Sequence, residues 1–310
     1  MTSYDHDLTL RPITGPAEIP LFNTFPYALN TEIPGDLEAT RRRTGWLWLA
    51  LRGDRVTARA GWWSRPGDSR PLLMDIFDIA GDPDDGVRLL TAAMAAVLPD
   101  GPAGMEYLQF VPPDWRDHDD TRRLVETRMA AAARTGAELF VERLRLQWLP
   151  GTPIPAAGDR LTFRPPRDPA ELVDLMTLVL DGTLDAYSRH DLARMTARQV
   201  AEQQYRGELE RYSSPHDWWR VATLPGGEPV GFVIPAHNAY HPIIAYIGVI
   251  PAYRGHGYID DLLAAGTRVL AAEDVPRIRA ATDVGNAPMA AAFARAGYVV
   301  FERQIDMTWH

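Results

Sequence analysis

The fold of this chain is decided by the stretch Val249-Ile250-Pro251-Ala252-Tyr253-Arg254-Gly255-His256-Gly257-Tyr258. It ends an almost continuously apolar run over residues 243–250, which is typical of a strand covered on both faces. A helix is predicted directly after it, because apolar residues recur at helical spacing: Ile259, Leu262, Leu263, Val269 and Leu270. A glycine loop in this setting can turn successive backbone N–H groups toward one point, at the positive end of the helix. The stretch therefore predicts a site that binds a pyrophosphate without a lysine.

The elements around this loop alternate between strands and helices. The second half of the chain is predicted to run in the order β-α-α-β-β-β-α-β-α-β-β. We expect strands near residues 161–164, 219–224, 231–235, 243–250, 277–282, 298–301 and 304–309, and helices near 170–180, 191–211, 259–270 and 289–296. This pattern indicates an α/β (α+β) fold with a mixed central sheet.

An internal repeat divides the chain. Leu8-Thr9-Leu10-Arg11-Pro12, followed by Pro16-Ala17-Glu18-Ile19, returns with the same spacing as Leu161-Thr162-Phe163-Arg164-Pro165 and Pro169-Ala170-Glu171-Leu172. Near the end of each half, Val141-Glu142-Arg143 is echoed by Phe301-Glu302-Arg303. Two similar units in tandem explain these matches better than one large fold.

We therefore predict two domains, at residues 1–149 and 159–310, each with a mixed sheet flanked by helices. Residues 150–158 are rich in proline and glycine and are the predicted linker. In the first half, strands are expected within residues 45–63, 72–79, 106–111 and 139–148, and helices near 87–98 and 121–135. The order of elements is then the same in both halves.

The amino-acid composition excludes several kinds of catalytic and binding site. The 310 residues include no cysteine and no lysine, so all 32 residues of the Lys+Arg count are arginine. This excludes a cysteine nucleophile, a thiolate metal site, a Schiff-base lysine and the phosphate-binding lysine of a P-loop. The net charge of -9 argues against a nucleic-acid partner. No window is long enough for a membrane span and residues 1–11 do not resemble a signal peptide, so we expect a cytoplasmic protein with no membrane partner.

The quoted loop resembles the acetyl-CoA-binding motif of the GCN5-related N-acetyltransferase (GNAT) family. In that family a strand ending in Val-x-Pro leads into Arg/Gln-x-x-Gly-x-Gly/Ala, and Arg254-Gly255-His256-Gly257-Tyr258 matches the first five positions. The second motif of the family has an Asn after the next strand, a helix and a Gly-aromatic pair. Here these are Asn286, the helix that carries Phe293, and Gly297-Tyr298.

The resemblance implies that acetyl-CoA is the co-substrate and that the second half binds it. The implied contacts come from the strand end, the loop and the second motif: Ile247, Val249, Ile250, Arg254, Gly255, His256, Gly257, Tyr258, Ile259, Asn286 and Phe293. The first half resembles a degenerate copy, because its corresponding loop Asp82-Pro83-Asp84-Asp85-Gly86 lacks the motif and its acids repel phosphates. Tandem members of the family with one working half, such as mycothiol synthase, are similar in plan.

Two positions after the loop depart from the family pattern. The last Gly/Ala position is Ile259, whose side chain narrows the approach to the phosphates. Asp260 and Asp261 follow it in the first helical turn, where acids stabilise a helix by about 0.3–1 kcal/mol. We interpret them as helix-starting residues turned away from the cofactor, with contact to the acceptor or an effect on cofactor choice as the alternative.

The catalytic groups also depart from the pattern. In the family an amine attacks the thioester carbonyl directly, and a tyrosine often protonates the thiolate that leaves. The oxyanion is held by a backbone N–H of the strand before the loop, which here lies near Ile247 to Val249. The position of that tyrosine is Phe293 here, and the strand over 243–250 carries no carboxylate for the role of base. The candidate replacements are Tyr246, His241 and Asp283. Each also has a structural interpretation, as a strand aromatic, a turn residue and a turn or cap residue.

Three other groups of residues give weaker signals about function. His237, His241 and His256 are not at ligand spacing on one element, so we expect no metal site. Arg41-Arg42-Arg43 is interpreted as a solvated face, or as a group that reaches a CoA phosphate or an acidic partner. The pairs Trp62-Trp63 and Trp218-Trp219 are expected in core or interdomain packing.

The predicted function is that of an acyl-CoA-dependent N-acyltransferase, an N-acetyltransferase that moves an acetyl group directly to an amine of a small molecule. The first alternative is a non-catalytic CoA- or acyl-CoA-binding protein, because Phe293 and the carboxylate-free strand fit lost chemistry. The second is other acyl-CoA chemistry on the same fold, such as decarboxylation or transfer of a longer acyl group. The sequence carries no signal for the identity of the acceptor or for the oligomeric state.

Overall fold

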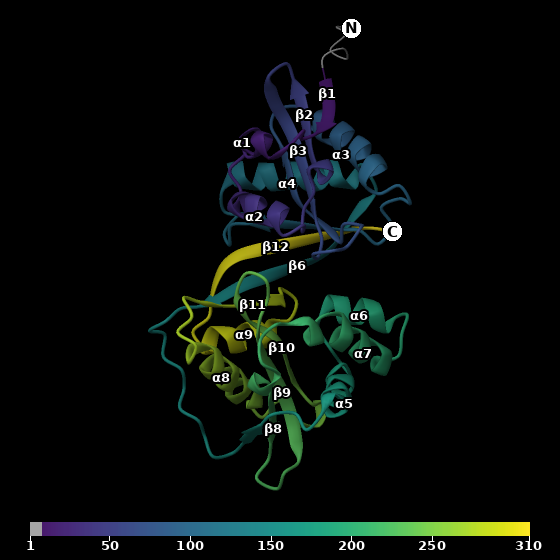
Figure 1. The fold of residues 1–310 in the computed structure, drawn as a ribbon. Helices are drawn as coiled ribbons and strands as arrows, with labels where there is room; N and C mark the ends of the chain where they lie inside the picture. The colour runs from purple at the N-terminus through teal and green to yellow at the C-terminus, as the bar shows by residue number, and fades with distance from the viewer. Residues whose placement is uncertain (1–7) are drawn as a thin grey trace. The chain divides into compact units, whose positions relative to one another are not determined.

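A computed structural model describes residues 8–310 of the chain. Residues 1–7, which include most of the segment that we expect not to be a signal peptide, lie outside the described range. The chain divides into two compact units (Figure 1). Unit 1 comprises Met1–Glu142 and Arg303–His310, and unit 2 comprises Arg143–Glu302. None of the helices within residues 8–310 is long and apolar enough to cross a membrane.

Unit 1 is built from strands that pair mostly as antiparallel hairpins, with two long helices. Its strands are β1 (Leu8–Pro12), β2 (Leu47–Arg52), β3 (Arg55–Trp63), β4 (Leu73–Ile79), β5 (Glu106–Val111), the first part of β6 (Ala137–Trp148) and the last part of β12 (Val299–Trp309). Its helices are α1 (Ile19–Phe22), α2 (Ile33–Glu38), α3 (Pro83–Val97) and α4 (Asp119–Ala133). Short 3-10 turns lie at Pro16–Glu18, Ala28–Thr31 and Thr44–Trp46.

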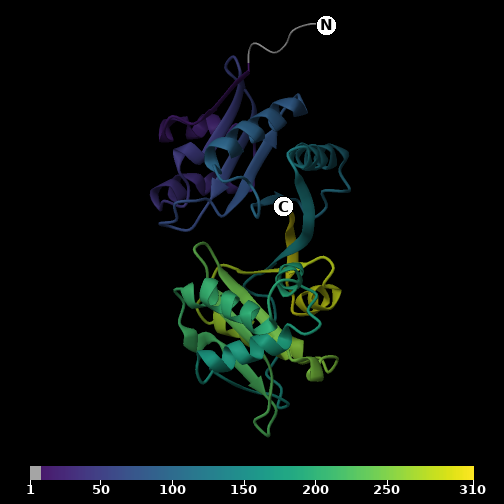
Figure 2. The same cartoon turned by 90° about the vertical axis from the view of Figure 1, so that its right-hand side faces the viewer.

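Unit 2 repeats this plan with more helix. Its strands are β7 (Thr162–Arg164), β8 (Arg220–Thr223), β9 (Pro229–His237), β10 (Pro242–Val249), β11 (Ile278–Asp283), the last part of β6 and the first part of β12. Its helices are α5 (Pro169–Val179), α6 (Ala186–Leu192), α7 (Ala197–Gly207), α8 (Tyr258–Ala271) and α9 (Ala287–Arg295). Helices α5, α6 and α7 cover one face of its sheet (Figure 2), and α8 packs on the opposite face.

The two units have the same strand order. In unit 1 the order is β1-β2-β3-β4-β5-β12, and in unit 2 it is β7-β8-β9-β10-β11-β6. The sixth strand comes from the other half of the sequence in both cases: Arg303–Thr308 of β12 pairs antiparallel with β5, and Arg143–Trp148 of β6 pairs antiparallel with β11. Relative to the predicted ranges 1–149 and 159–310, the units therefore exchange the ends of their last strands.

In both units, the two neighbouring parallel strands of the sheet separate at the same position. The parallel pair β10 and β11 is in register only at Ile243 and Arg279, and the parallel pair β4 and β5 only at residues 73–74 and 106–107. One extra residue bulges from the central strand just beyond, Ala245 in β10 and Asp75 in β4. A bulge bends a strand and increases its twist, so the neighbouring parallel strands diverge toward their carboxyl ends.

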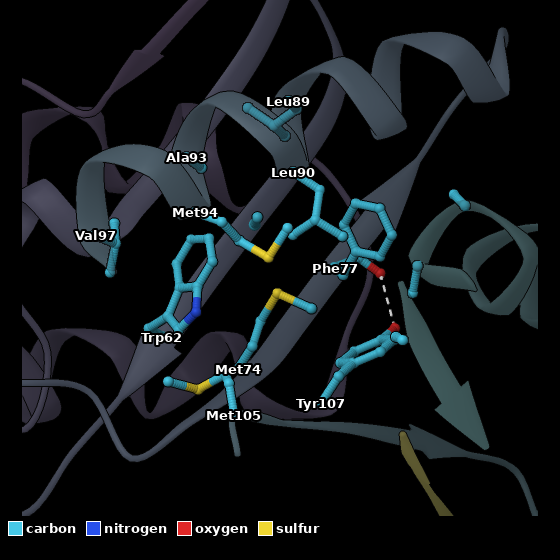
Figure 3. Close-up of a cluster of buried hydrophobic side chains, with 14 of the residues drawn as sticks. Trp62, Met74, Phe77, Leu89, Leu90, Ala93, Met94, Val97, Met105 and Tyr107 are labelled. Carbon is cyan, nitrogen blue, oxygen red and sulfur yellow. Dashed lines mark hydrogen bonds between the residues drawn. The ribbon is translucent and has the colours of Figure 1, made fainter. Parts of the chain in front are cut away.

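The cores are apolar layers between sheet and helices. In unit 1, side chains of β3, β4 and β5 pack under α3, and Figure 3 shows Trp62, Met74 and Phe77 against Leu90 and Met94. In unit 2 one layer lies under α8 and α9 and a second lies under α5 and α7. Trp62 and Trp219 are almost fully buried, which confirms the prediction of core packing for one tryptophan of each pair.

The sequence repeat forms the same local structure twice. Arg11 donates two hydrogen bonds of 2.8 Å to Glu18, and Arg164 donates bonds of 2.8 and 2.6 Å to Glu171. Each glutamate also accepts a 2.7 Å bond from a backbone N–H four residues before it. The motif thus ties the first strand of each unit to the turn that follows it.

Two predicted elements were wrong in detail. The polar segment 191–211 is not one helix. It contains the end of α6, the whole of α7 and a 3-10 turn at Leu209–Arg211, because Thr196 begins a new helix with a capping box that includes Gln199. The last two predicted strands are one continuous strand, β12, since no turn residue interrupts residues 299–309.

Candidate active site

The glycine loop of unit 2 lies at the carboxyl end of β10, where β10 and β11 part. A 3-10 turn over Pro251–Tyr253 leads into it, and α8 begins at Tyr258. Gly255 and Gly257 have φ angles of 81° and 73°, in the left-handed region that favours glycine. Gly257 is the N-cap of α8 and supplies no side chain to cap the helix.

The loop presents a row of unpartnered donors. Among residues 8–310, no acceptor takes a hydrogen bond from the backbone N–H groups of residues 255–259. These groups precede and open a helix whose N-terminus carries a partial positive charge. Such a row is a cradle for an anion, and hydrogen bonds to charged groups contribute about 1.5–3 kcal/mol each. The arrangement fits a pyrophosphate.

The exposed Arg254 side chain folds back onto backbone carbonyls at the ends of β10 and α5. Its Nε donates to the carbonyl of Val249 at 3.1 Å, and its Nη atoms donate to the carbonyls of Asp181 and Val179 at 2.7 and 2.8 Å. These bonds cap the end of α5 and fix the loop against it. Arg254 is thus a positioning residue for the cradle, with its guanidinium engaged within unit 2.

A second arginine holds the loop from the outside. Arg160 donates to the carbonyls of His256 and Gly257 at 2.9 and 3.0 Å, and its guanidinium lies 5.1 Å from the Tyr258 ring. Arg160 also pairs with Asp261, while Asp260 pairs with Arg295 of α9. Both acids are engaged by arginines, which supports their interpretation as residues turned away from the cradle.

The strand before the loop offers donors for an oxyanion. The N–H of Ile250 donates to the Val230 carbonyl of β9 at 2.9 Å. Because successive peptide groups of a strand alternate sides, the N–H groups of Val249 and Ile247 point away from β9. They therefore face the side on which β10 and β11 part, as the predicted oxyanion contact requires.

The remaining residues expected at the cofactor are placed as follows. Asn286 caps α9, with its side-chain oxygen accepting from the N–H of Met289 at 3.3 Å. Phe293 is 2% exposed and packs edge to face against Tyr298 in the core. Ile259 and Tyr258 pack partly buried on the layer under α8, and the His256 ring stacks near Tyr258.

Tyr246 is the catalytic candidate that lies nearest the parted strands. It follows the bulge of β10 and packs edge to face on Phe232, on the side covered by α5 and α7. Burial, followed by the charge of Asp185, raises its pKa above the usual value. The hydroxyl therefore stays protonated at neutral pH and can act as a proton donor.

Asp283 is buried and already engaged. Its Oδ2 accepts a 2.6 Å hydrogen bond from the N–H of Ala186, the first residue of α6, and its Oδ1 lies 3.0 Å from Nε of Arg143. Burial raises its pKa, while these two partners oppose the shift. Asp283 therefore fixes the start of α6 to the end of β11.

His241 lies at the opposite end of β10 from the loop. Its backbone N–H donates to the side chain of Asn238 in the turn between β9 and β10. Burial, followed by the charges of Arg279, Arg277 and Arg145, lowers the pKa of its imidazole. Since a strand rises about 3.3 Å per residue, His241 lies about 26 Å along the strand from Val249, where β10 ends, and about 17 Å from Tyr246.

One further interpretation is contradicted by the structure. Arg42 is 2% exposed, so its interpretation as part of a solvated face is wrong: it is drawn into the core of unit 1 by ion pairs with Asp36 and Asp75. Within the described residues, no group of three or more His, Asp or Glu side chains is arranged to hold a metal ion.

Three residues of the site were missed by sequence reasoning. Arg160 holds the loop, and Arg143 and Asp185 lie beside Asp283 and Tyr246. Asp185 had a local signal, because an Asp that starts a helix is a common N-cap and its side chain caps α6. The arginines had none, since their partners are far away in the sequence.

Comparisons with known proteins agree with this geometry. The family model "Acetyltransferase (GNAT) domain" matches residues 160–299. No curated protein matches the chain. The fold is similar to that of a GCN5-related N-acetyltransferase from Sphaerobacter thermophilus, with a TM-score of 0.59 and 15% identity over 97% of this chain and 94% of that one.

A second similar structure is a tandem GNAT protein from the clavulanic acid biosynthesis pathway, with a TM-score of 0.53 and 17% identity over 97% of this chain and 98% of that one. At sequence identities this low, the structural similarity is evidence for the fold only. The predicted fold class, two GNAT-like units in tandem, is thereby confirmed.

Proposed function

We propose that the chain, whose residues 160–299 match the GNAT acetyltransferase family model, is an acyl-CoA-dependent N-acyltransferase whose acyl-CoA binds in unit 2. The observation that carries the proposal is the row of unpartnered N–H groups at residues 255–259, set where β10 and β11 part. We propose acetyl-CoA as donor and a small-molecule amine as acceptor.

The proposed reaction is direct transfer. The amine nitrogen attacks the thioester carbonyl, a C–N bond forms, the C–S bond breaks and CoA leaves as a thiolate. The N–H groups of Ile247 and Val249 are oriented to stabilise the oxyanion, a contribution typical of backbone donors in a site that excludes water. No cysteine or lysine is needed in this scheme, which agrees with a sequence that has neither.

We assign the proton transfer to the leaving thiolate to Tyr246. It is the candidate with a protonated hydroxyl beside the parted strands, and it is free of hydrogen-bond partners among the described residues. Asp283 is committed to Ala186 and Arg143, and His241 is at the far end of β10. The amine proton passes to solvent in this scheme.

Calorimetry and a thiol-release assay test the proposal together. We expect acetyl-CoA to bind the full chain and acetyl-pantetheine, which lacks the pyrophosphate, to bind at least about 100-fold more weakly, because two or more charge-assisted bonds are lost. Thiol release should depend on an added amine. Tyr246→Phe should lower kcat about tenfold with unchanged acetyl-CoA affinity, in the lower range for a proton donor. Equal affinity for both thioesters contradicts the cradle, and binding without thiol release for any amine favours the non-catalytic alternative.

A further inference from the structure

The segment between β6 and β7, which includes the expected linker, is docked on unit 2. We call residues 149–161 the strap. Most of its side chains are exposed, and its middle has no regular secondary structure. Ile154 nevertheless packs partly buried against the apolar layer under α8 and α9. The carbonyl of Pro155 accepts a 2.7 Å hydrogen bond from Arg268 of α8. The strap is therefore held along the helix that the glycine loop opens.

The strap ends at the glycine loop. Its last residue but one, Arg160, donates from its Nη atoms to the carbonyls of His256 and Gly257, at 2.9 and 3.0 Å. Its Nε donates to the carboxylate of Asp261 at 2.8 Å, and its Cζ lies 5.1 Å from the centroid of the Tyr258 ring. Although the side chain is 46% exposed, all three nitrogens of the guanidinium are engaged by the loop and the first turn of α8.

The two carbonyls belong to peptide groups of the phosphate cradle. Their N–H donors are those of Gly257 and Tyr258, within the row of unpartnered donors at residues 255–259. A trans peptide is planar, and its C=O and N–H bonds point in opposite directions. One guanidinium that takes both carbonyls therefore turns both N–H groups away from the strap. Arg160 thus acts on a bound pyrophosphate through the backbone.

The same guanidinium neutralises an acid beside the cradle. Asp261 lies in the first turn of α8, where an unpaired carboxylate repels a phosphate. The adjacent Asp260 has an arginine of its own, Arg295 of α9. Within the described residues, Arg295 donates to that carboxylate and to no carbonyl of the loop. The two arginines therefore separate neutralisation of an acid from orientation of the loop.

We propose that Arg160 is a positioning residue for the acyl-CoA cradle and that the strap is the element that holds it in place. The inference rests on the proposed function, because it needs an acyl-CoA whose pyrophosphate binds at residues 255–259. The expected linker is then part of the cofactor site. Docking of the strap and binding of acyl-CoA favour each other to the same extent, since a coupling between two binding equilibria is reciprocal.

Calorimetry with acetyl-CoA and the full chain tests the role of Arg160. Arg160→Gln should weaken binding at least about tenfold, because two donors lose their fixed direction and one hydrogen bond to a charged group is worth about that factor. Arg160→Lys should lie between this variant and the wild type, since it keeps the charge without the fork. Arg295→Gln removes the same charge from the adjacent acid and is the matched control, expected within about threefold of the wild type. Equal losses in Arg160→Gln and Arg295→Gln overturn the proposal.

A double variant separates orientation from charge. Asp261→Asn combined with Arg160→Gln removes both partners of the ion pair, and the loop carbonyls still lack their donor. Acetyl-CoA affinity should therefore stay at least about fivefold below that of the wild type. A return to wild-type affinity means that Arg160 acts only on the charge of Asp261, and it overturns the positioning role.

Stability and kinetics separate positioning from a general structural role. Without ligand, the thermal midpoint of Arg160→Gln should stay near that of the wild type, because an exposed ion pair contributes little to stability. The KM for acetyl-CoA should rise while kcat at saturating acetyl-CoA changes less than about twofold. A large loss of thermal stability, or a fall in kcat as large as the fall in affinity, indicates a structural role and contradicts the assignment.

Hydrogen exchange tests the strap itself. Saturating acetyl-CoA should slow exchange of the backbone N–H groups of residues 156–160 at least about fivefold in the wild type, the lower end of typical coupling between sites. Arg160→Gln, also saturated with acetyl-CoA, should show no such slowing. Equal slowing in both proteins, or none in the wild type, overturns the coupling.

The wild-type titration distinguishes the two levels of inference. If acetyl-CoA does not bind the wild type, the proposed function fails. If acetyl-CoA binds the wild type and Arg160→Gln equally well, only the assignment of Arg160 and the strap fails.

Discussion

Unit 1 and unit 2 share their strand order, their bulge and their arginine–glutamate clamp, yet they differ at the carboxyl end of the central strand. In unit 2, residues 250–257 connect β10 to α8 and end in an N-cap glycine with no capping side chain. In unit 1, only residues 80–82 connect β4 to α3, and the Asp82 carboxylate accepts a hydrogen bond from the N–H of Asp84. The helix terminus that is open to an anion in unit 2 already holds a carboxylate in unit 1.

The space between the parted strands differs as well. Alignment of the units on their bulges places Asp75 opposite Ala245 and, through the parallel register, Tyr107 opposite Ala280. Tyr107 is buried and its hydroxyl donates to the carbonyl of Phe77 at 3.5 Å, so it bridges β5 to β4 (Figure 3). Unit 2 has only a methyl group at that position. At these two positions the same fold therefore holds a buried tyrosine and a buried aspartate in unit 1, and two alanines in unit 2.

The largest expected effect comes from making unit 1 resemble unit 2 at the bulge. Asp75 accepts two 2.7 Å hydrogen bonds from the buried Arg42. Asp75→Ala, which copies Ala245, leaves that guanidinium short of a partner and should lower the free energy of unfolding by about 3–5 kcal/mol. Urea unfolding, with hydrogen exchange to localise the change to unit 1, measures it. Asp100→Ala removes an exposed ion pair with Arg70 and should cost less than about 1 kcal/mol. Equal effects of the two substitutions contradict a buried network.

The next effect comes from making unit 2 resemble unit 1 at the helix terminus. Gly257→Asp places a carboxylate where Asp82 stands in unit 1, and an Asp tolerates the positive φ better than most residues. We expect acetyl-CoA affinity to fall at least about 100-fold, because the carboxylate competes for the N–H donors and repels phosphate. Gly257→Asn, of the same shape without the charge, should lose about tenfold or less by calorimetry. Wild-type affinity in Gly257→Asp argues against the cradle.

The smallest effect concerns the feature that the units share. The Arg11 side chain, followed by the N–H of Thr14, lowers the pKa of Glu18 to about 2, and Arg164 lowers the pKa of Glu171. A carboxyl whose pKa is depressed by folding stabilises the protein above its unfolded pKa, and this contribution is lost as the pH falls through the folded pKa. We therefore expect stability from these clamps to decline slightly between about pH 4.5 and pH 2.

Carboxyl NMR titration checks this expectation in both units. Glu18→Gln and Glu171→Gln should each flatten that part of the pH profile of unfolding by a similar amount. A Glu18 that titrates near 4.5 shows that its clamp does not form in solution.

Much of the fold was predictable because its signals are local. The apolar run before Pro251, the glycines of the loop and the spacing of Leu262 and Leu263 depend only on near neighbours in the chain. The repeated motif led to two units, and the same motif forms the same clamp in each. The exchange of β6 and β12 was not predictable, because strand pairing over such separations depends on which sheet edge is open, a property of the folded units.

The candidate site divides in the same way. The glycine loop, the phenylalanine at the position of the expected tyrosine and the absence of lysine and cysteine chemistry could all be identified from the amino-acid sequence. The folded structure was needed to show that Arg254 binds the end of α5, that Asp283 is committed to α6 and that Arg145 and Arg279 flank an exposed Ala281. Backbone conformation follows from residues adjacent in the chain, whereas the partner of a charged side chain is set by segments brought together only when the strands pair.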